Sequence, residues 1–370
     1  MVTDLAEKAA RIHADLPVVD GHNDLAWALR IRAGSDLEVA DPCNALDGYQ
    51  TDVPRLAAGG VGAQFWSVYI PAWDATPLRS TLEQIDLVGR FTARCDNLEA
   101  AANAADAAAI RARGHTASLL GAEGGHCIED SLDGLRRLRH LGVRYLTLTH
   151  ADTISWADSA TDEPRHGGLT DFGEDVVREM NRIGMIVDIS HVSPDTMRHA
   201  LQVSDRPVIA SHSGAFTLAG HPRNVPDDVL ELVGQNDGVV MVNFYPAFVT
   251  QAAAEHGAGS FALARDLQKR LGDDAAVDAE LVRRLLEDPF PEVTVGDVVD
   301  HIEHIAHVAG VDHVGIGSDF DGIDATPVGL EDVSTYPAIT MELLRRGWGE
   351  PEIRLVLGEN AMRVLGENDE

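Results

Sequence analysis

Ionisable side chains of the kinds that bind divalent metal ions stand at the ends of six short apolar runs. They are His22 in VDGHND, Glu123 in GAEGGH, His150 in LTLTH, His191 in DISHVS, His212 in VIASHS and Asp319 in GIGSDFDG. Imidazole nitrogens and carboxylate oxygens are good zinc ligands, and one carboxylate can contact two cations through its two oxygens. The sequence therefore indicates metal-assisted hydrolysis, in which a cation lowers the pKa of a water molecule.

Two of these motifs place a second metal-capable side chain two residues further on: Asp24 follows His22, and Asp321 follows Asp319. On an extended strand, side chains two residues apart point in the same direction. His22 and Asp24 are therefore candidate ligands of one ion. Asp319 could both bind an ion and take a proton from water. Asp321, one step further into the following loop, is the competing candidate.

Two further residues could contact a substrate. His150, as a residue that does not bind metal, could donate a hydrogen bond to a developing oxyanion. Arg223, in HPRNVPDD, suits the two-pronged recognition of a substrate carboxylate. A surface ion pair of Arg223 with Asp227 or Asp228 is an equally good explanation of this segment.

Other residues of these types are expected to be structural. His301, His304 and His307 repeat every three residues on a predicted helix, which places them on the outside of the fold, and we expect a solvated face there. Cys127 lies close to Glu123 but has no positioned base in the sequence, so we expect a structural thiol.

The apolar runs alternate with helix-like stretches, which is typical of a parallel sheet. Eight runs have this character: residues 17–22, 61–70, 117–123, 143–150, 185–191, 207–212, 238–245 and 313–319. Eight strands predict an α/β fold of the (β/α)8 TIM-type barrel class, as one domain over residues 1–370. The active site of such a barrel lies at the C-terminal ends of its strands, so the candidate ligands should converge.

Helical spacing of apolar residues predicts helices over 132–141, 171–183 and 194–203. Long helical insertions are expected at 78–113 and 252–286, with the alanine-rich stretch 98–112 as a helix.

Charge and cysteine content restrict the class of protein. The 29 Lys and Arg residues against 60 Asp and Glu residues give a net charge of −31, which argues against nucleic-acid and membrane partners. The cysteines Cys43, Cys95 and Cys127 are too few and too scattered for a disulfide framework. The sequence has no recognisable signal peptide, membrane span or hydrophobic C-terminal tail. We therefore expect a cytoplasmic protein with reduced thiols.

In order along the chain, the motifs VDGHNDL, FWSVY, GAEGGH, YLTLTH, ISHVS, VIASHS, HPRNVPDD, GVVMVNFY and GSDFDG resemble the membrane (renal) dipeptidase family. The resemblance runs from about residue 12 to about residue 365. That family consists of zinc peptidases with an amidohydrolase-like barrel. The chain resembles a bacterial-type, soluble member of it.

The resemblance implies a role for each matching residue. It implies two zinc ions bridged by Glu123, the first also held by His22, Asp24 and Asp319 and the second by His191 and His212. His150 would contact the scissile group, Arg223 would hold the C-terminal carboxylate of the substrate, and Asp319 would transfer the proton. The matching pocket-lining positions are Trp27, Tyr69, Asn224 and Tyr245.

The function that the resemblance implies is zinc-dependent hydrolysis of small dipeptides by a metal-bridged water, with a D-residue accepted at the C-terminal position by the family. The alternatives are other amidohydrolase-type chemistry on lactones, β-lactams or acyl groups, and a non-catalytic metal-binding protein. We expect a dipeptide substrate and a homodimer as the candidate assembly. The loops 73–80 and 155–168 are expected to select the substrate side chains.

Overall fold

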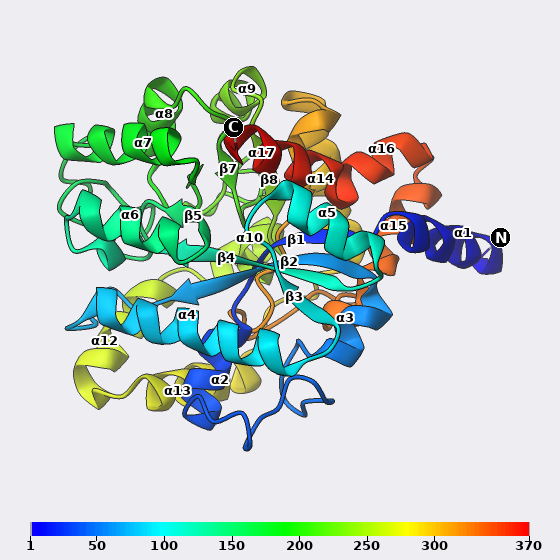
Figure 1. Ribbon diagram of the computed structural model, residues 1–370, viewed down its shortest axis with the longest axis horizontal. Coiled ribbons are helices and arrows are strands. Elements are labelled where there is room, and N and C mark those ends of the chain that lie inside the picture. Colours follow the sequence, from blue (N-terminus) through cyan, green and yellow to red (C-terminus); the bar gives the residue numbers. More distant parts are fainter. Residues whose placement is uncertain (1, 370) are drawn as a thin grey trace.

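Eight parallel strands close into a ring at the centre of the computed structural model, which describes residues 2–369 (Figure 1). In order around the ring they are β1 (Val18–Asn23), β2 (Val61–Tyr69), β4 (Thr116–Glu123), β5 (Val143–Thr147), β6 (Ile186–Asp188), β7 (Ile209–Ala210), β8 (Val239–Val242) and β9 (Val314–Ile316). The ring closes because β9 pairs with β1 and β2 pairs with β4. The predicted (β/α)8 TIM-type barrel is confirmed, with all eight expected strands present.

The strands are almost completely buried, because their own side chains fill the inside of the ring and helices cover its outside. The side chains of Phe65, Leu119, Tyr145, Ile186 and Met241 come from five strands and belong to one hydrophobic cluster. This packing holds the strand ends, and hence the residues that follow them, in fixed positions.

Helices surround the barrel in the order that the alternating pattern predicts. They are α1 (Val2–Asp15), α2 (Leu25–Ala33), α3 (Val53–Gly59), α4 (Pro77–Arg94), α5 (Ala104–Ala112), α6 (Leu132–His140), α7 (Asp171–Ile183), α8 (Pro194–Val203), α9 (Asp227–Gln235), α10 (Pro246–Val249), α11 (Gln251–His256), α12 (Ser260–Leu271), α13 (Asp274–Glu287), α14 (Val295–Val308), α15 (Pro337–Arg345), α16 (Glu350–Arg354) and α17 (Asn360–Asp369). Helices α7 and α8 have the predicted bounds.

The alanine-rich stretch 98–112 differs from the prediction of a single helix. Leu98–Ala100 forms a short strand, β3, which pairs with the first residues of β4 on the edge that β5 leaves free. Helix α5 starts only after Asn103, whose side chain accepts a hydrogen bond from the amide of Asp106. An unpaired strand edge and an N-cap therefore override the helix propensity of the alanines.

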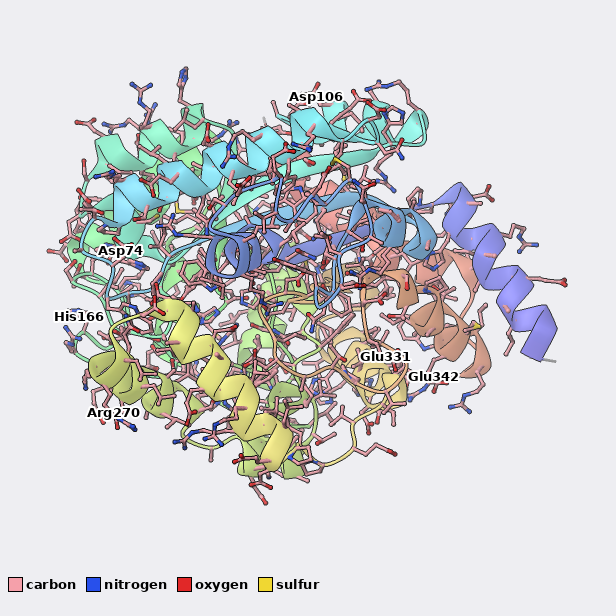
Figure 2. All side chains as sticks on the ribbon, turned by 90° about the horizontal axis from the view of Figure 1, so that it is seen from below. Asp74, Asp106, His166, Arg270, Glu331 and Glu342 are labelled. Carbon is pink, nitrogen blue, oxygen red and sulfur yellow. A yellow bond between two sulfur atoms is a disulfide. The ribbon has the colours of Figure 1, made fainter. Side chains whose placement is uncertain are left out.

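The insertion between β8 and β9 contains helices α10 to α13. The predicted helical insertion at 252–286 is therefore confirmed, as three helices. Figure 2 shows α12 and α13 lying side by side across one side of the molecule, with Arg270 near the end of α12. Both helices contribute residues to the wall of the cavity described below.

Two of the three cysteines form a disulfide, so the expectation of reduced thiols is wrong for them. Cys43, in the segment between α2 and α3, is bonded to Cys95 at the end of α4, 52 residues further along the chain. The packing of α2 against α4 brings these distant positions together, and no local sequence pattern reports such a contact. Cys127 is a buried free thiol, and burial raises its pKa to about 12.

Between residues 2 and 369, none of the helices combines the length and the apolar character that a membrane crossing requires.

Candidate metal centre

Glu123, the last residue of β4, lies at the centre of a cluster of imidazoles and carboxylates. Its Oε2 atom is 3.4 Å from Nε2 of His22, which in turn is 3.2 Å from Oδ2 of Asp24. Its Oε1 atom is 3.0 Å from Nε2 of His191 and 3.3 Å from Nε2 of His212. The two oxygens of one carboxylate thus face two different groups of ligand atoms, as a carboxylate between two metal ions must.

Asp319 completes the cluster from the segment after β9. Ligand atoms of His22, His212 and Asp319 lie within 4.8 Å of one another. Oδ2 of Asp319 accepts a hydrogen bond of 2.8 Å from the side chain of Asn243, which leaves Oδ1 available. A Cβ atom at Gly322 would lie 2.7 Å from that Oδ1. Only glycine lets the chain pass so close to the carboxylate.

The charges in the cluster are crowded and buried. Burial, together with the neighbouring carboxylates of Asp24 and Glu123, raises the pKa of Asp319 well above its usual range. Burial would also raise the pKa of Glu123, but the charge of His22 and hydrogen bonds from the other imidazoles hold it well below its usual range. Buried carboxylates at this density need positive charge beside them. A divalent cation would supply it.

Two of the imidazoles, His191 and His212, have the neutral state that metal binding requires. Burial would also lower the pKa of His22, but the neighbouring carboxylates of Glu123 and Asp24 raise it well above its usual range. Burial lowers the pKa values of His191 and His212 well below the usual range, so both rings are neutral. Their Nε2 atoms face each other at 2.9 Å. In the part of the chain that the structure describes, Nε2 of His22 and Oδ1 of Asp24 are buried without a hydrogen-bond partner. Mixed imidazole and carboxylate donors with unused lone pairs fit zinc.

The backbone is strained at two of the candidate ligands. His191 and Asp319 both have φ near +68°, in the left-handed region that residues with a side chain rarely adopt. Each such residue costs about 1 kcal/mol or more. Both side chains lie in the cluster, with Nε2 of His191 3.0 Å from Oε1 of Glu123 and Asp319 beside His22 and His212.

A cavity of about 270 Å³ opens above the cluster. One part of its wall contains Asp24, Glu123, His191 and Asp319, and the remainder is mainly aromatic and acidic. The predicted pocket residues Trp27, Tyr69 and Tyr245 all line it. The rings of Trp27 and Tyr69 pack edge to face with their centroids 5.0 Å apart.

Arg223 lies in the wall of the cavity and is fully buried. Its Nη2 donates to the backbone oxygen of His212 at 3.1 Å, and its Nε has no hydrogen-bond partner among residues 2–369. The alternative of a surface ion pair is wrong, because Asp228 pairs with Arg198 and Asp227 with His304. A buried guanidinium with a free donor is suited to an anionic ligand.

His150 also lines the cavity, between the rings of Tyr69 and His191. Its Nε2 is 3.8 Å from Oε1 of Glu123. Burial lowers the pKa of His150 to about 4, and the charge of Arg223 adds to this effect. The ring is therefore neutral at neutral pH and has one N–H to donate.

Asn224 is not among the residues of the cavity wall. Its side-chain nitrogen donates to the backbone oxygens of Ala219 and Phe248, and its side-chain oxygen accepts from the amide of Gly214. These bonds hold the loop that carries Arg223. Asp321 does line the cavity, but its Oδ1 accepts from the amide of Gln50 at 2.9 Å.

The histidines of α14 stay outside the cluster, as expected, but their environment differs from the solvated face that the sequence suggests. His301 is buried under the loop after β7, where its Nδ1 accepts from the amide of Ala215. His304 is partly buried beside Asp227, and His307 is exposed. The loop after β7 covers His301 on α14. The spacing of three residues in the sequence does not show that another segment packs over the helix there.

Sequence reasoning missed one wall of the cavity. Of the expected loops, 73–80 contributes Trp73, whereas none of the described residues in 155–168 lines the cavity. That wall belongs instead to α12 and α13, with Phe261, Ala264, Asp274, Asp278 and Leu281. Within each of the two helices these positions are three or four residues apart, so they share one helix face. This spacing was the sequence signal that could have identified the wall.

Comparisons with known proteins agree with this geometry. The family described as "Membrane dipeptidase (Peptidase family M19)" matches residues 6–370. The chain is 40% identical over 368 residues to "Dipeptidase 3" of Rattus norvegicus. The aligned region covers 98% of this chain and 67% of that protein.

Solved structures share the fold. The probable dipeptidase PvdM from Pseudomonas aeruginosa superposes with a TM-score of 0.82 at 21% identity, covering 99% of this chain and 98% of that one. A metallo peptidase from Rhodobacter sphaeroides, liganded with a phosphinate mimic of the dipeptide L-Ala-D-Ala, gives a TM-score of 0.76 at 24% identity, with 95% and 99% coverage.

Proposed function

This chain belongs to the membrane dipeptidase family (peptidase family M19), whose members are metal-dependent peptide hydrolases, and we propose that it cleaves dipeptides with two zinc ions at the Glu123 cluster. The first ion would be held by His22, Asp24, Asp319 and Oε2 of Glu123. The second would be held by His191, His212 and Oε1 of Glu123. The observation that carries the proposal is the division of the two oxygens of Glu123 between two groups of ligand atoms.

Bound zinc supplies a Lewis acid for the carbonyl oxygen and lowers the pKa of a water molecule. The protein must then move one proton from that water to the leaving amine. Asp319 is the group for this transfer, because Asn243 holds its carboxylate at the edge of the cluster, in the wall of the cavity that would receive the substrate.

His150 is the group that stabilises the developing oxyanion. Its neutral ring lies beside the cluster in the cavity wall, and an imidazole with a pKa of about 4 donates a hydrogen bond without exchanging its proton. The packing of this ring between Tyr69 and His191 restricts its orientation.

Arg223 is the group that holds the C-terminal carboxylate of the dipeptide. Its guanidinium is buried in the wall that also contains the cluster, so a substrate bound there must place its carboxylate close to the scissile bond. A carboxylate clamp in the same cavity wall as the cluster would favour short substrates such as dipeptides.

We include dipeptides with a C-terminal D-residue among the substrates. The support is the ligand of the Rhodobacter sphaeroides relative, a mimic of L-Ala-D-Ala. The carboxylate of either stereoisomer can reach a fixed guanidinium, because inversion exchanges the positions of the side chain and the hydrogen.

The test is metal analysis combined with a dipeptide-hydrolysis assay on the same preparation. We expect about two zinc ions per chain, loss of hydrolysis after chelation and its return when zinc is added. L-Ala-L-Ala and L-Ala-D-Ala are the substrates to compare. Full activity in a metal-free preparation, or a metal-loaded protein that cleaves neither dipeptide, would contradict the proposal.

A further inference from the structure

The imidazoles of His22 and His212 each contact a buried hydroxyl group on the side of the ring away from Glu123. Nδ1 of His22 is 2.8 Å from the phenol oxygen of Tyr145, and Nδ1 of His212 is 2.7 Å from Oγ of Ser211. Tyr145 and Ser211 are fully buried and lie below the cluster, out of contact with the cavity.

The proton of the Tyr145 hydroxyl is committed elsewhere. The phenol donates to the backbone oxygen of Gly21 at 3.2 Å, and a carbonyl oxygen can only accept. With its proton on the oxygen of Gly21, the phenol accepts the hydrogen bond from Nδ1–H of His22, and we assign the tautomer of His22 on this basis. Room for the ring comes from Gly121, where a Cβ atom would lie 1.9 Å from Cζ of Tyr145.

The proton of the Ser211 hydroxyl is committed in the same way. Oγ of Ser211 donates to Oδ2 of Asp188 at 2.7 Å. The same carboxylate also accepts from Thr147 Oγ1 and from the amides of Ser190 and Ser211. Surrounded by donors, Asp188 acts as an acceptor, so Oγ of Ser211 accepts from Nδ1–H of His212.

We propose that Tyr145 and Ser211 are positioning residues that fix the proton of each imidazole on Nδ1 and so keep the lone pair of Nε2 directed at the metal centre. An imidazole whose only proton is on the distal nitrogen binds a cation without first rearranging. This inference rests on the proposed metal-dependent function and adds two residues that contact neither metal nor substrate.

The third imidazole provides an internal contrast. Nδ1 of His191 is buried and, across the described chain, has no hydrogen-bond partner. Its ring orientation is set instead by the left-handed backbone and by stacking on His150. The hydroxyl contacts therefore belong to two of the three rings, one in each group of ligand atoms.

The experiment is a zinc titration of the metal-free protein in competition with a chromophoric chelator, for the wild type, Tyr145→Phe and Ser211→Ala. Loss of such a partner typically weakens metal binding by about 10- to 100-fold. We expect Tyr145→Phe to weaken the ion at His22 and Ser211→Ala to weaken the ion at His212. Each variant should therefore alter one of the two binding steps. At saturating zinc both variants should regain most of their dipeptidase activity, because every ligand is still present.

Two matched variants separate positioning from simple loss of a buried hydrogen bond. Tyr336→Phe removes a buried phenol that donates to Asp20 at 2.7 Å, and Thr147→Val removes another donor to Asp188. Neither hydroxyl contacts an imidazole of the cluster, so both variants should bind zinc like the wild type.

Several results would overturn the inference. One is an unchanged zinc affinity in both Tyr145→Phe and Ser211→Ala while the wild type binds two ions. Another is an equal loss of affinity in the two matched variants. A wild type that binds no divalent ion would instead refute the proposed function itself. If Tyr145→Phe fails to fold, Ser211→Ala alone decides the question.

Discussion

The cluster around Glu123 and the histidines of α14 contain the same residue types, yet the structure gives them opposite surroundings. In the cluster, Nε2 of His22 has no hydrogen-bond partner in the described chain and three carboxylates crowd around the rings. In α14, both ring nitrogens of His301 are occupied, Nδ1 by the amide of Ala215 and Nε2 by the backbone oxygen of Val249 at 2.7 Å. The cluster therefore differs from the α14 histidines in its unused lone pairs and excess negative charge, and these features, rather than the spacing of histidines, support the proposed metal site.

The difference follows from where each group lies on the barrel. Residues after the strand ends project toward the axis, so groups from distant segments converge there. Residues on an outer helix face only their neighbours, so their polar atoms are satisfied locally or by water. His301 thus stabilises the loop after β7, and His304 pairs with Asp227.

The strongest test of this comparison exchanges histidines in the two regions. His212→Ala should remove one zinc ion and lower kcat/KM by about a thousandfold or more, since a metal ion contributes several kcal/mol to transition-state stabilisation. The double variant His301→Gln, His304→Gln should keep both ions. Metal content and dipeptide kinetics on the same preparations are the measurements. Loss of zinc from the double variant alone would reverse the comparison.

The next test concerns Arg223, for which the sequence left two roles open, and compares it with Arg198, an arginine in a surface ion pair. Arg223→Met should weaken transition-state stabilisation for a free dipeptide, measured from kcat/KM, by about 2 to 5 kcal/mol. The reason is that the buried carboxylate of the substrate loses its charged partner. A dipeptide with an amidated C-terminus should be affected far less. Arg198→Met is the matched control, since Arg198 pairs with Asp228 at the surface, and it should cost at most about 1 kcal/mol of stability. Equal effects of Arg223→Met on both substrates would assign the carboxylate to another group.

The third test uses the burial of His301. Burial lowers the pKa of His301 to about 4, against 6.5 for an exposed ring. The unfolded chain therefore binds a proton that the folded chain does not, at every pH between these two values. The contribution of this histidine to stability is complete above pH 6.5 and falls by about 2 kcal/mol between pH 6.5 and pH 5. Urea unfolding of the wild type and His301→Gln across this range should differ by that amount, and parallel pH profiles would contradict the burial of the ring.

The smallest expected effect is at the contact between α9 and α14. Asp227→Asn removes the charge beside His304, a partly exposed pair that contributes at most about 1 kcal/mol. Zinc content and kcat/KM should be unchanged. A variant that loses zinc would show that the contact between Asp227 and His304 affects the cluster.

The sequence was sufficient to predict which candidate residues the barrel brings together. The convergence of His22, Glu123, His191, His212 and Asp319 could be predicted because each follows an apolar run, and strand ends converge in any barrel of this class. The positions of the strands could also be predicted from the sequence, because burial on both faces makes their apolar runs continuous.

Features that depend on contacts between distant segments could not be read in the same way. Asn224 lies next to Arg223 but faces the loop, because backbone groups far along the chain capture its side chain. The cavity wall formed by Phe261 and Leu281 depends on how α12 and α13 fold back over the barrel. The Cys43–Cys95 bond depends on helix packing.

The left-handed backbone at His191 and Asp319 has a consequence for the kinetics of ion exchange. The chain's own hydrogen bonds hold both residues in place: the amide of Ala160 donates to the backbone oxygen of His191, and the amide of Asp319 donates to that of His22. Loading and unloading of the centre therefore require no remodelling of either loop. The rate of zinc uptake should depend on dehydration of the arriving ion and its passage through the cavity. Uptake at each of the two proposed sites should lack the slow phase that a folding step would add.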